Sequence, residues 1–134
     1  MKATPLLLAA SLGLTAACAA PGIQADKGSM QALIGDAACS TDAQCKTMPV
    51  GAKACGGPQS YLAWSSARTE EAALRSMSDA SAEADRKQAE AKGMASTCTV
   101  VPDPGAFCDM SQPTAGSPGS CRLRSGKGGG ALAR

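Results

Sequence analysis

Small and apolar positions recur at helical spacing in the middle of the chain, between Gln59 and Lys92. This stretch has no glycine or proline and is dominated by residues that favour helix. Tyr61 and Trp64, spaced i, i+3, are expected on one face of a first helical segment. A second helical segment follows and is expected to end at Gly93. One face of it carries a stripe of residues at helical spacing, which is properly apolar only in the first turns. The stripe consists of Leu74, Met77, Ser81, Ala84, Gln88 and Ala91.

The stretches on either side of this helical region have other patterns. Residues 39–58 carry three cysteines between Pro and Gly breakers, which predicts a turn-rich knot without regular structure. Thr97–Val101 and Ser120–Arg124 have β-type composition and are expected to pair as a short antiparallel ribbon. Pro102 and Pro104 should end the first of these runs or confine it to an edge.

The first residues have the layout of a secretory signal peptide. Lys2 supplies a positive charge, and Leu6–Ala17 is an uncharged run of Leu, Ala and other small or apolar residues. The run is shorter than the roughly 20 residues that a membrane-spanning helix needs. We therefore expect a leader over residues 1–17, or over 1–19, according to where it is cut.

Cys18 decides between these two cuts. In one, Ala17-Cys18-Ala19 is an A-x-A site, and Cys18 leaves with the leader. In the other, "LTAAC" resembles the lipobox of bacterial lipoproteins, although Thr15 stands where a lipobox usually has Leu. Cys18 would then be acylated and become the first residue of the mature protein, anchoring it to a membrane.

Either cut leaves six cysteines, an even set that can pair completely in an oxidising compartment. Alanine outnumbers all large apolar side chains in the mature chain, so a core alone recovers little of the lost chain entropy. The prediction is a small disulfide-stapled α+β fold, with one or two helices over about 59–92, a turn-rich cysteine knot and a short antiparallel ribbon. The disulfide cysteines would be Cys39, Cys45, Cys55, Cys98, Cys108 and Cys121.

Composition also predicts the organisation of the mature chain. Residues 18–36 mix Pro, Gly, Gln and Ser with isolated apolar residues and are expected to be a flexible tether, with one helical turn around Met30 to Ile34. Residues 37–124 would form the stapled domain. Residues 125–134 would be a disordered basic tail, either solvated or in contact with anionic lipid or polysaccharide.

Charge and residue usage narrow the function classes. Acidic and basic residues nearly balance, so we expect no nucleic-acid partner. The chain has no histidine, which excludes Ser-His and Cys-His nucleophilic sites and histidine metal sites within this chain. No two cysteines form a C-x2-C pair, so disulfides are favoured over zinc and no metal or cofactor is expected. The acids lie mostly on a solvated helix or beside turns, so we expect no enzymatic activity.

Tyr61 and Trp64 are the candidate binding residues. As core anchors they would pack over a disulfide, whereas as an exposed pair they would stack on a sugar or a peptide.

The run Cys39 to Ser66 resembles a pattern in uncharacterised cysteine-rich secreted proteins and lipoproteins of bacteria. These proteins show C-x5-C, a glycine-containing spacer, and then C-G-G-P followed by an aromatic residue and Ser. The matching positions here are Cys39, Cys45, Gly51, Cys55, Gly56, Gly57, Pro58, Tyr61, Trp64 and Ser65. The resemblance covers roughly residues 37–124; it implies export and a disulfide module, and it implies no activity.

The sequence thus predicts an exported, non-enzymatic protein of the bacterial cell envelope, in the outer membrane or the periplasm, anchored by a lipid on Cys18. Its partner would be an envelope or extracellular protein or a glycan. The alternative is a freely secreted protease inhibitor or effector-like protein. It would present a stapled loop, Val100 to Phe107, whose rigidity leaves little entropy to lose on binding.

Overall fold

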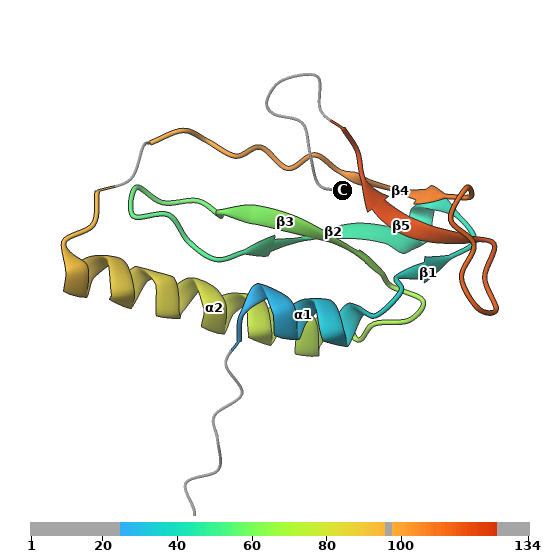
Figure 1. The fold of residues 1–134 in the computed structure, drawn as a ribbon, viewed down its shortest axis with the longest axis horizontal. Coiled ribbons are helices and arrows are strands. Elements are labelled where there is room, and N and C mark those ends of the chain that lie inside the picture. Colours follow the sequence, from blue (N-terminus) through green and yellow to red (C-terminus); the bar gives the residue numbers. More distant parts are fainter. Residues whose placement is uncertain (1–24, 96–97, 126–134) are drawn as a thin grey trace, which may run out of the picture.

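The computed structural model describes residues 25–95 and 98–125 of the chain. Both helices lie along one side of the strands (Figure 1). The protein is a small, disulfide-rich α+β protein, which confirms the predicted fold class. In chain order the elements are α1 (Lys27–Ile34), β1 (Ala38–Cys39), the 3-10 turn η1 (Asp42–Gln44), β2 (Cys45–Val50), β3 (Ser60–Ser65), α2 (Glu71–Lys92), β4 (Ala106–Asp109) and β5 (Gly119–Leu123).

The strands form two antiparallel sheets. β2 and β3 make a hairpin whose ladder runs from the pair Cys45–Ser65 to the pair Val50–Ser60. The other sheet has the order β1-β5-β4, so that the first strand pairs with the last. These non-local pairings bring distant parts of the chain together and position the cysteines for bonding.

The core lies between the hairpin and the helices. Successive residues of a strand point to opposite faces, so Met48, Leu62 and Trp64 share one face of the hairpin. They are buried in one cluster with Met30 of α1 and Leu74 of α2, both of which are fully shielded from solvent. Complete burial of such a side chain contributes roughly 1.5–3 kcal/mol.

The opposite face of the hairpin is covered by a different part of the chain. Cys45 on this face is bonded to Cys121 of β5. Further along β2, the Thr47 hydroxyl donates to the carboxylate of Asp103 at 2.7 Å. The hairpin therefore lies between the helices on one side and the residues that follow Cys98 on the other.

The structure confirms the second predicted helical segment as α2. The Glu70 carboxylate caps its start by accepting from the backbone amide of Ala73 at 2.8 Å. Gly93 ends it with a left-handed φ of 58°, as expected for a helix C-terminus. Leu74, Ser78 and Ser81 are buried, whereas the stripe positions after them are exposed. The apolar stripe is thus confined to the first turns, as the pattern predicts.

The predicted first helical segment is wrong, because Ser60–Ser65 is strand β3. Tyr61 and Trp64 consequently point to opposite faces of the hairpin instead of sharing one helical face. Leu62 and Trp64, two positions apart, are the buried pair. Pairing with β2 along the whole strand overrides the helical composition of the stretch.

The predicted ribbon and knot also need correction. β5 pairs with β4 and β1, and the described residues of the run expected at 97–101 form no strand; Thr97 lies outside the described residues. The proline after this run explains the difference, because it has no N–H to continue a ladder. Residues 45–50 of the supposedly irregular knot form β2, although Gly56 and Gly57 take the positive φ angles of a turn.

The predicted tether over 18–36 ends earlier than expected. Asp26 caps α1 by accepting from the Ser29 amide at 2.8 Å, and Met30 and Ile34 belong to the core. The folded domain therefore begins near Asp26 and not at residue 37. The helical turn expected around Met30 to Ile34 is confirmed as part of α1. The tail beyond Ser125, together with Cys18 and the leader, lies outside the described residues.

Candidate functional site

The six predicted cysteines are all paired in three disulfides. Cys39 of β1 is bonded to Cys108 of β4, and Cys45 of β2 to Cys121 of β5. The third bond joins Cys55, in the turn of the hairpin, to Cys98, after α2. Their sequence separations are 69, 76 and 43 residues, so each bond closes a long loop of the unfolded chain.

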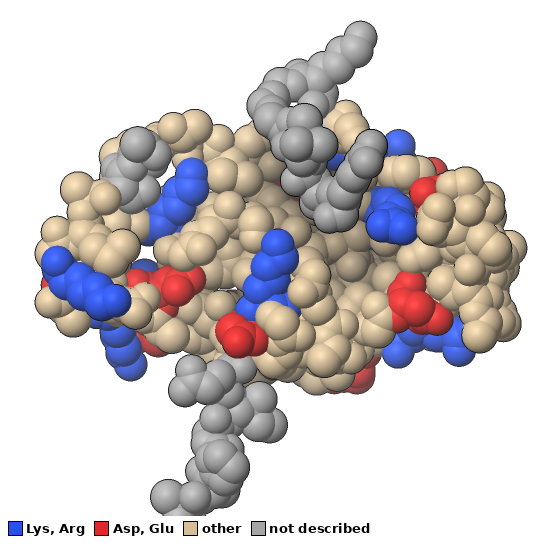
Figure 2. Space-filling model, viewed as in Figure 1, with Lys and Arg blue, Asp and Glu red and all other residues tan. Residues whose placement is uncertain are grey.

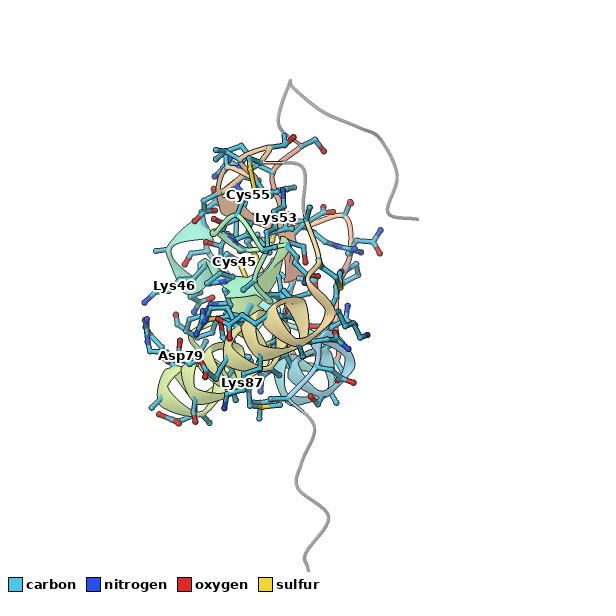
Figure 3. All side chains as sticks on the ribbon, turned by 90° about the vertical axis from the view of Figure 1, so that its left-hand side faces the viewer. Cys45, Lys46, Lys53, Cys55, Asp79 and Lys87 are labelled. Carbon is cyan, nitrogen blue, oxygen red and sulfur yellow. A yellow bond between two sulfur atoms is a disulfide. The ribbon has the colours of Figure 1, made fainter. Side chains whose placement is uncertain are left out.

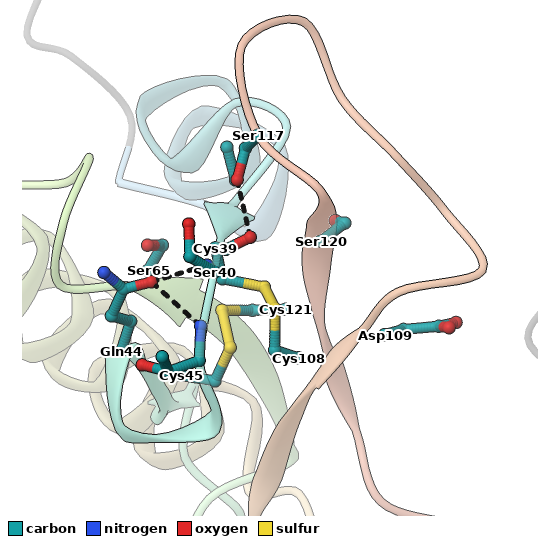
Figure 4. The surroundings of a disulfide bond; sticks show 12 residues. Cys39, Ser40, Gln44, Cys45, Ser65, Cys108, Asp109, Ser117, Ser120 and Cys121 are labelled. Atoms are coloured by element: carbon teal, nitrogen blue, oxygen red, sulfur yellow. Dashed lines mark hydrogen bonds between the residues drawn. A yellow bond between two sulfur atoms is a disulfide. The ribbon is translucent and has the colours of Figure 1, made fainter.

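The first two disulfides lie side by side in the core (Figure 4). The sulfur atoms of Cys39, Cys45 and Cys108 are all within 4.8 Å of one another. Three thiolates at this spacing would suit zinc, but these sulfur atoms are engaged in disulfides, and zinc binds the thiolate. Cys45–Cys121 therefore joins the two sheets, whereas Cys39–Cys108 joins the two outer strands of the three-stranded sheet.

The third disulfide is exposed and fastens one end of an irregular segment, residues 98–105, which we call the strap. Figure 1 shows the strap running along the side of the strands that is remote from α1 and α2. In the turned view, Lys53 and Cys55 of the hairpin turn lie well away from Asp79 and Lys87 of α2 (Figure 3). The strap is thus separated from the helical layer by the hairpin.

Hydrogen bonds fasten the strap along its length. The Lys53 ammonium donates to the carbonyl oxygen of Thr99, next to the disulfide. In the middle, the Asp103 carboxylate accepts from the Thr47 hydroxyl. At the far end, the Gly105 carbonyl accepts from the Arg124 amide at 2.9 Å, and the chain enters β4. The strap is therefore held at its start, middle and end.

The sequence of the strap favours an extended backbone. Pro102 and Pro104 fix their own φ angles and disfavour the helical region for the residues before them, Val101 and Asp103. Gly105 then turns the chain into β4 with a φ of 70°, which favours glycine. The extended path thus results from local sterics as well as from the fastenings.

The strap exposes one large apolar side chain and an unused stretch of backbone. Val100 is 82% exposed, the highest value among the large apolar residues that are exposed in the described ranges. Within those ranges, the backbone N–H and C=O groups of Val100 and Val101 have no intramolecular hydrogen-bond partner. These groups are available to another molecule.

The predicted loop, Val100 to Phe107, is displaced from the segment that the structure presents. Phe107 belongs to β4, is half-buried, and has the Arg124 guanidinium 5.6 Å from its ring centre. The presented segment is the strap, which begins at Cys98 and ends before β4. The sequence had no local signal for Thr47 and Lys53, since they are 56 and 46 residues from the strap residues they bind.

The structure separates the two candidate binding residues. Trp64 is 1% exposed and anchors the core, and the Lys46 ammonium lies 5.7 Å from its ring centre. Tyr61 is half-buried on the opposite face of the hairpin, the face crossed by the strap. They therefore cannot act as an exposed pair that stacks on a sugar or peptide.

A polar groove of about 570 Å³ lies between α2, the hairpin turn and the start of α1. The Asp85 carboxylate in this groove accepts from the amide of Ala52 at 2.9 Å and from the side-chain amide of Gln59 at 3.0 Å. These two hydrogen bonds to Asp85 clamp the hairpin turn to α2.

Among the residues that the structure describes, four carboxyls have a displaced pKa, and in all four the pKa is lowered. The Arg75 hydrogen bond and Lys46 lower the pKa of Glu71, and Arg86 and Lys87 lower that of Glu83. Hydrogen bonds from Ser29 and Ser111 lower the pKa of Asp26 and Asp109, respectively. A general acid needs the opposite shift, toward neutral pH.

The surface shown in Figure 2 carries Lys and Arg interspersed with Asp and Glu, without one dominant sign of charge. Within residues 25–95 and 98–125, no helix has the length and apolarity needed to cross a membrane. No family model, curated protein or solved structure matches the chain.

Proposed function

We propose that this protein is an exported, non-enzymatic binding module of the bacterial cell envelope, anchored by a lipid on Cys18, and that it presents the strap to a partner. The observation that carries the proposal is the pairing of all six cysteines after the leader. Disulfides of this number form and persist in oxidising compartments, and a small core benefits most from them.

The fastened strap supports a binding role. Its backbone groups at Val100 and Val101 are unpaired within the described residues, while its ends are held by Cys55 and by β4. A segment that is already ordered loses little conformational entropy on binding.

The lipid anchor rests on the sequence around Cys18, "LTAAC", at the end of the leader. An anchored protein would stand off from its membrane on the residues that precede Asp26. The freely secreted alternative has the same stapled domain and differs only in losing Cys18 with the leader.

The intact mass of the protein from its native host tests this proposal. We expect a mass that begins at Cys18 plus acyl chains, with six further thiols that react with an alkylating agent only after reduction. A mass that begins at Ala20 without lipid would support the secreted alternative. A chain with its leader retained and its six cysteines alkylated before reduction would contradict export altogether.

A further inference from the structure

We propose that the strap is a substrate-like segment that occupies and blocks the cleft of an endopeptidase, with Val100 in a pocket that takes a small aliphatic side chain. This inference rests on the proposed binding function and gives its partner a chemical class.

Endopeptidases bind a polypeptide in an extended conformation, and they hydrogen-bond its backbone groups on both sides of the bond to be cut. The strap supplies both requirements. Pro102 holds Val101 in the extended region, and the N–H and C=O groups of Val100 and Val101 are unpaired within the described residues. The side chain of Val100 is 82% exposed, so it can enter a pocket without rearrangement of the fold.

The length of the segment favours an endopeptidase cleft over addition of the strap to another sheet. Pro102 and Pro104 have no N–H, so they interrupt any ladder that continues beyond Val101. A strand added to a sheet gains its affinity from a longer series of backbone hydrogen bonds. An endopeptidase cleft holds a peptide mainly at the residues that flank the cut bond, here Val100 and Val101, whose backbone groups are unpaired within the described residues.

The fastening of the strap makes it a better inhibitor than a free peptide of the same sequence. A free peptide must lose backbone conformational entropy when a cleft orders it. The Cys55–Cys98 disulfide, the Lys53 contact with Thr99 and the Thr47 contact with Asp103 have already ordered the strap in the free protein. That part of the entropy loss does not recur when the cleft binds it.

The same fastening explains how the strap would resist consumption by the enzyme. Hydrolysis of the Val100–Val101 bond would add one water and leave a carboxylate on Val100 and an amino group on Val101. The new carboxyl end would still be held through Cys98, and the new amino end through Asp103 and β4. Because the two ends stay close together, they favour re-formation of the peptide bond with loss of the same water.

The test uses the purified mature protein with its three disulfides intact, and it measures inhibition constants against endopeptidases of known pocket preference. The panel contains aliphatic-preferring members of the serine, cysteine and metallo classes, a basic-preferring enzyme and an aromatic-preferring enzyme. We expect competitive inhibition of at least one aliphatic-preferring enzyme, with the protein recovered uncut at 100–101 or as a held two-chain form.

Variants of Val100 locate the inhibition in the strap. Val100→Asp should raise the inhibition constant by at least about 30-fold, the effect of an interface hot spot. Val100→Lys should move inhibition to the basic-preferring enzyme, which is a gain that damage to the fold cannot produce. Leu33→Asp and Met110→Asp are matched controls, since these side chains are also exposed, at 40% and 53%, but lie outside the strap. Both controls should inhibit like the wild type.

A wild-type protein that inhibits no member of the panel, or that is cut at 100–101 and loses its inhibition, would overturn the inference. A photo-crosslinking residue at position 100, expressed in the native host, separates this failure from that of the proposed function. A crosslink to an identified envelope protein that is not a protease, without inhibition, overturns the inference and leaves the binding module. The absence of both a crosslink and inhibition contradicts both.

Discussion

Cys108 and Cys121 lie directly opposite each other in the β4–β5 ladder, yet each is bonded to a cysteine from another strand. Cys108 reaches Cys39 in β1, and Cys121 reaches Cys45 in β2. The two disulfides therefore join one pair of strands to two separate partners. This arrangement fixes both sheets together and places two disulfides in contact.

This contact predicts exchange between the two core disulfides when one partner is removed. In Cys39→Ser, the freed Cys108 thiolate lies within 4.8 Å of the Cys45 sulfur and can attack it, which releases Cys121. The new bond to Cys108 forms as the old one breaks, and the proton lost by Cys108 ends on the released thiol. Peptide mapping should find Cys108 bonded to Cys45 in part of the protein.

The matched control for exchange is Cys55→Ser, which frees Cys98 at the other end of the hairpin. Cys98 lies outside the β4–β5 ladder and outside the cluster of core sulfur atoms. The Cys39–Cys108 and Cys45–Cys121 bonds should therefore remain. Finding only Cys45–Cys121 in Cys39→Ser, under mildly alkaline conditions that favour the thiolate, would contradict contact-driven exchange.

Deletion of whole disulfides should separate the staple in the core from the fastening of the strap. Loop closure alone predicts about 4–4.5 kcal/mol for both the Cys45–Cys121 and the Cys55–Cys98 bond. Cys121 is also buried, so Cys45→Ala with Cys121→Ala leaves a cavity and should cost more. Denaturant unfolding measures this difference. Cys55→Ala with Cys98→Ala should chiefly loosen the strap, which lower NMR order parameters at Val100 and Val101 would report.

Two results would contradict the expected effects of deleting the Cys45–Cys121 and Cys55–Cys98 disulfides. Equal losses of unfolding free energy would mean that burial of Cys121 adds nothing to loop closure. Unchanged order parameters at Val100 and Val101 after loss of Cys55–Cys98 would mean that the remaining hydrogen bonds alone order the strap and that the disulfide does not.

Met30 tests whether α1 belongs to the folded domain. The side chain is fully buried in the core cluster, so Met30→Ala should lower the free energy of unfolding by about 2–5 kcal/mol. Leu33, on the same helix, is 40% exposed, and Leu33→Ala should cost much less. Similar small effects of both changes would restore the flexible tether that composition alone predicts for residues 18–36.

The sequence predicts local features of this protein well and non-local ones poorly. The second helix, its end at Gly93 and the confinement of its apolar stripe to the first turns follow from neighbours in the chain. The set of six bonded cysteines follows from their even number. Strand β3 does not, because its composition favours helix and only pairing with β2 makes it a strand.

The candidate site shows the same division. The prolines of the strap and the cysteines around it are visible in the sequence, and a stapled loop from Val100 to Phe107 could be predicted from them, whereas the exposure of Val100 could not. Its boundaries could not, because they are set by β4 and by contacts with Thr47 and Lys53 on a distant hairpin. Likewise, burial of Trp64 away from Tyr61 depends on which face of that hairpin the helices cover.

Gly51 is required both for its backbone conformation and for the space that it leaves beside Asp85. Its φ is 68°, and a Cβ added there would lie 2.5 Å from a carboxylate oxygen of Asp85. Gly51→Ala should therefore combine the strain of a left-handed residue, about 1–2 kcal/mol, with loss of the contacts that clamp the hairpin turn to α2. Denaturant unfolding of the oxidised protein measures the total.

Gly57→Ala separates the two contributions, because Gly57 has a φ of 78° but nothing within 4 Å of an added Cβ. It should show the backbone strain alone. In the background Asp85→Ala, the shortest contact at residue 51 is removed and the Gln59 side chain remains at 3.1 Å, so Gly51→Ala should cost less than in the wild type and approach the cost of Gly57→Ala. If Gly51→Ala costs the same free energy of unfolding with and without Asp85, the hairpin turn accommodates the added carbon freely. The close approach of Gly51 to Asp85 would then not contribute to holding the turn against α2.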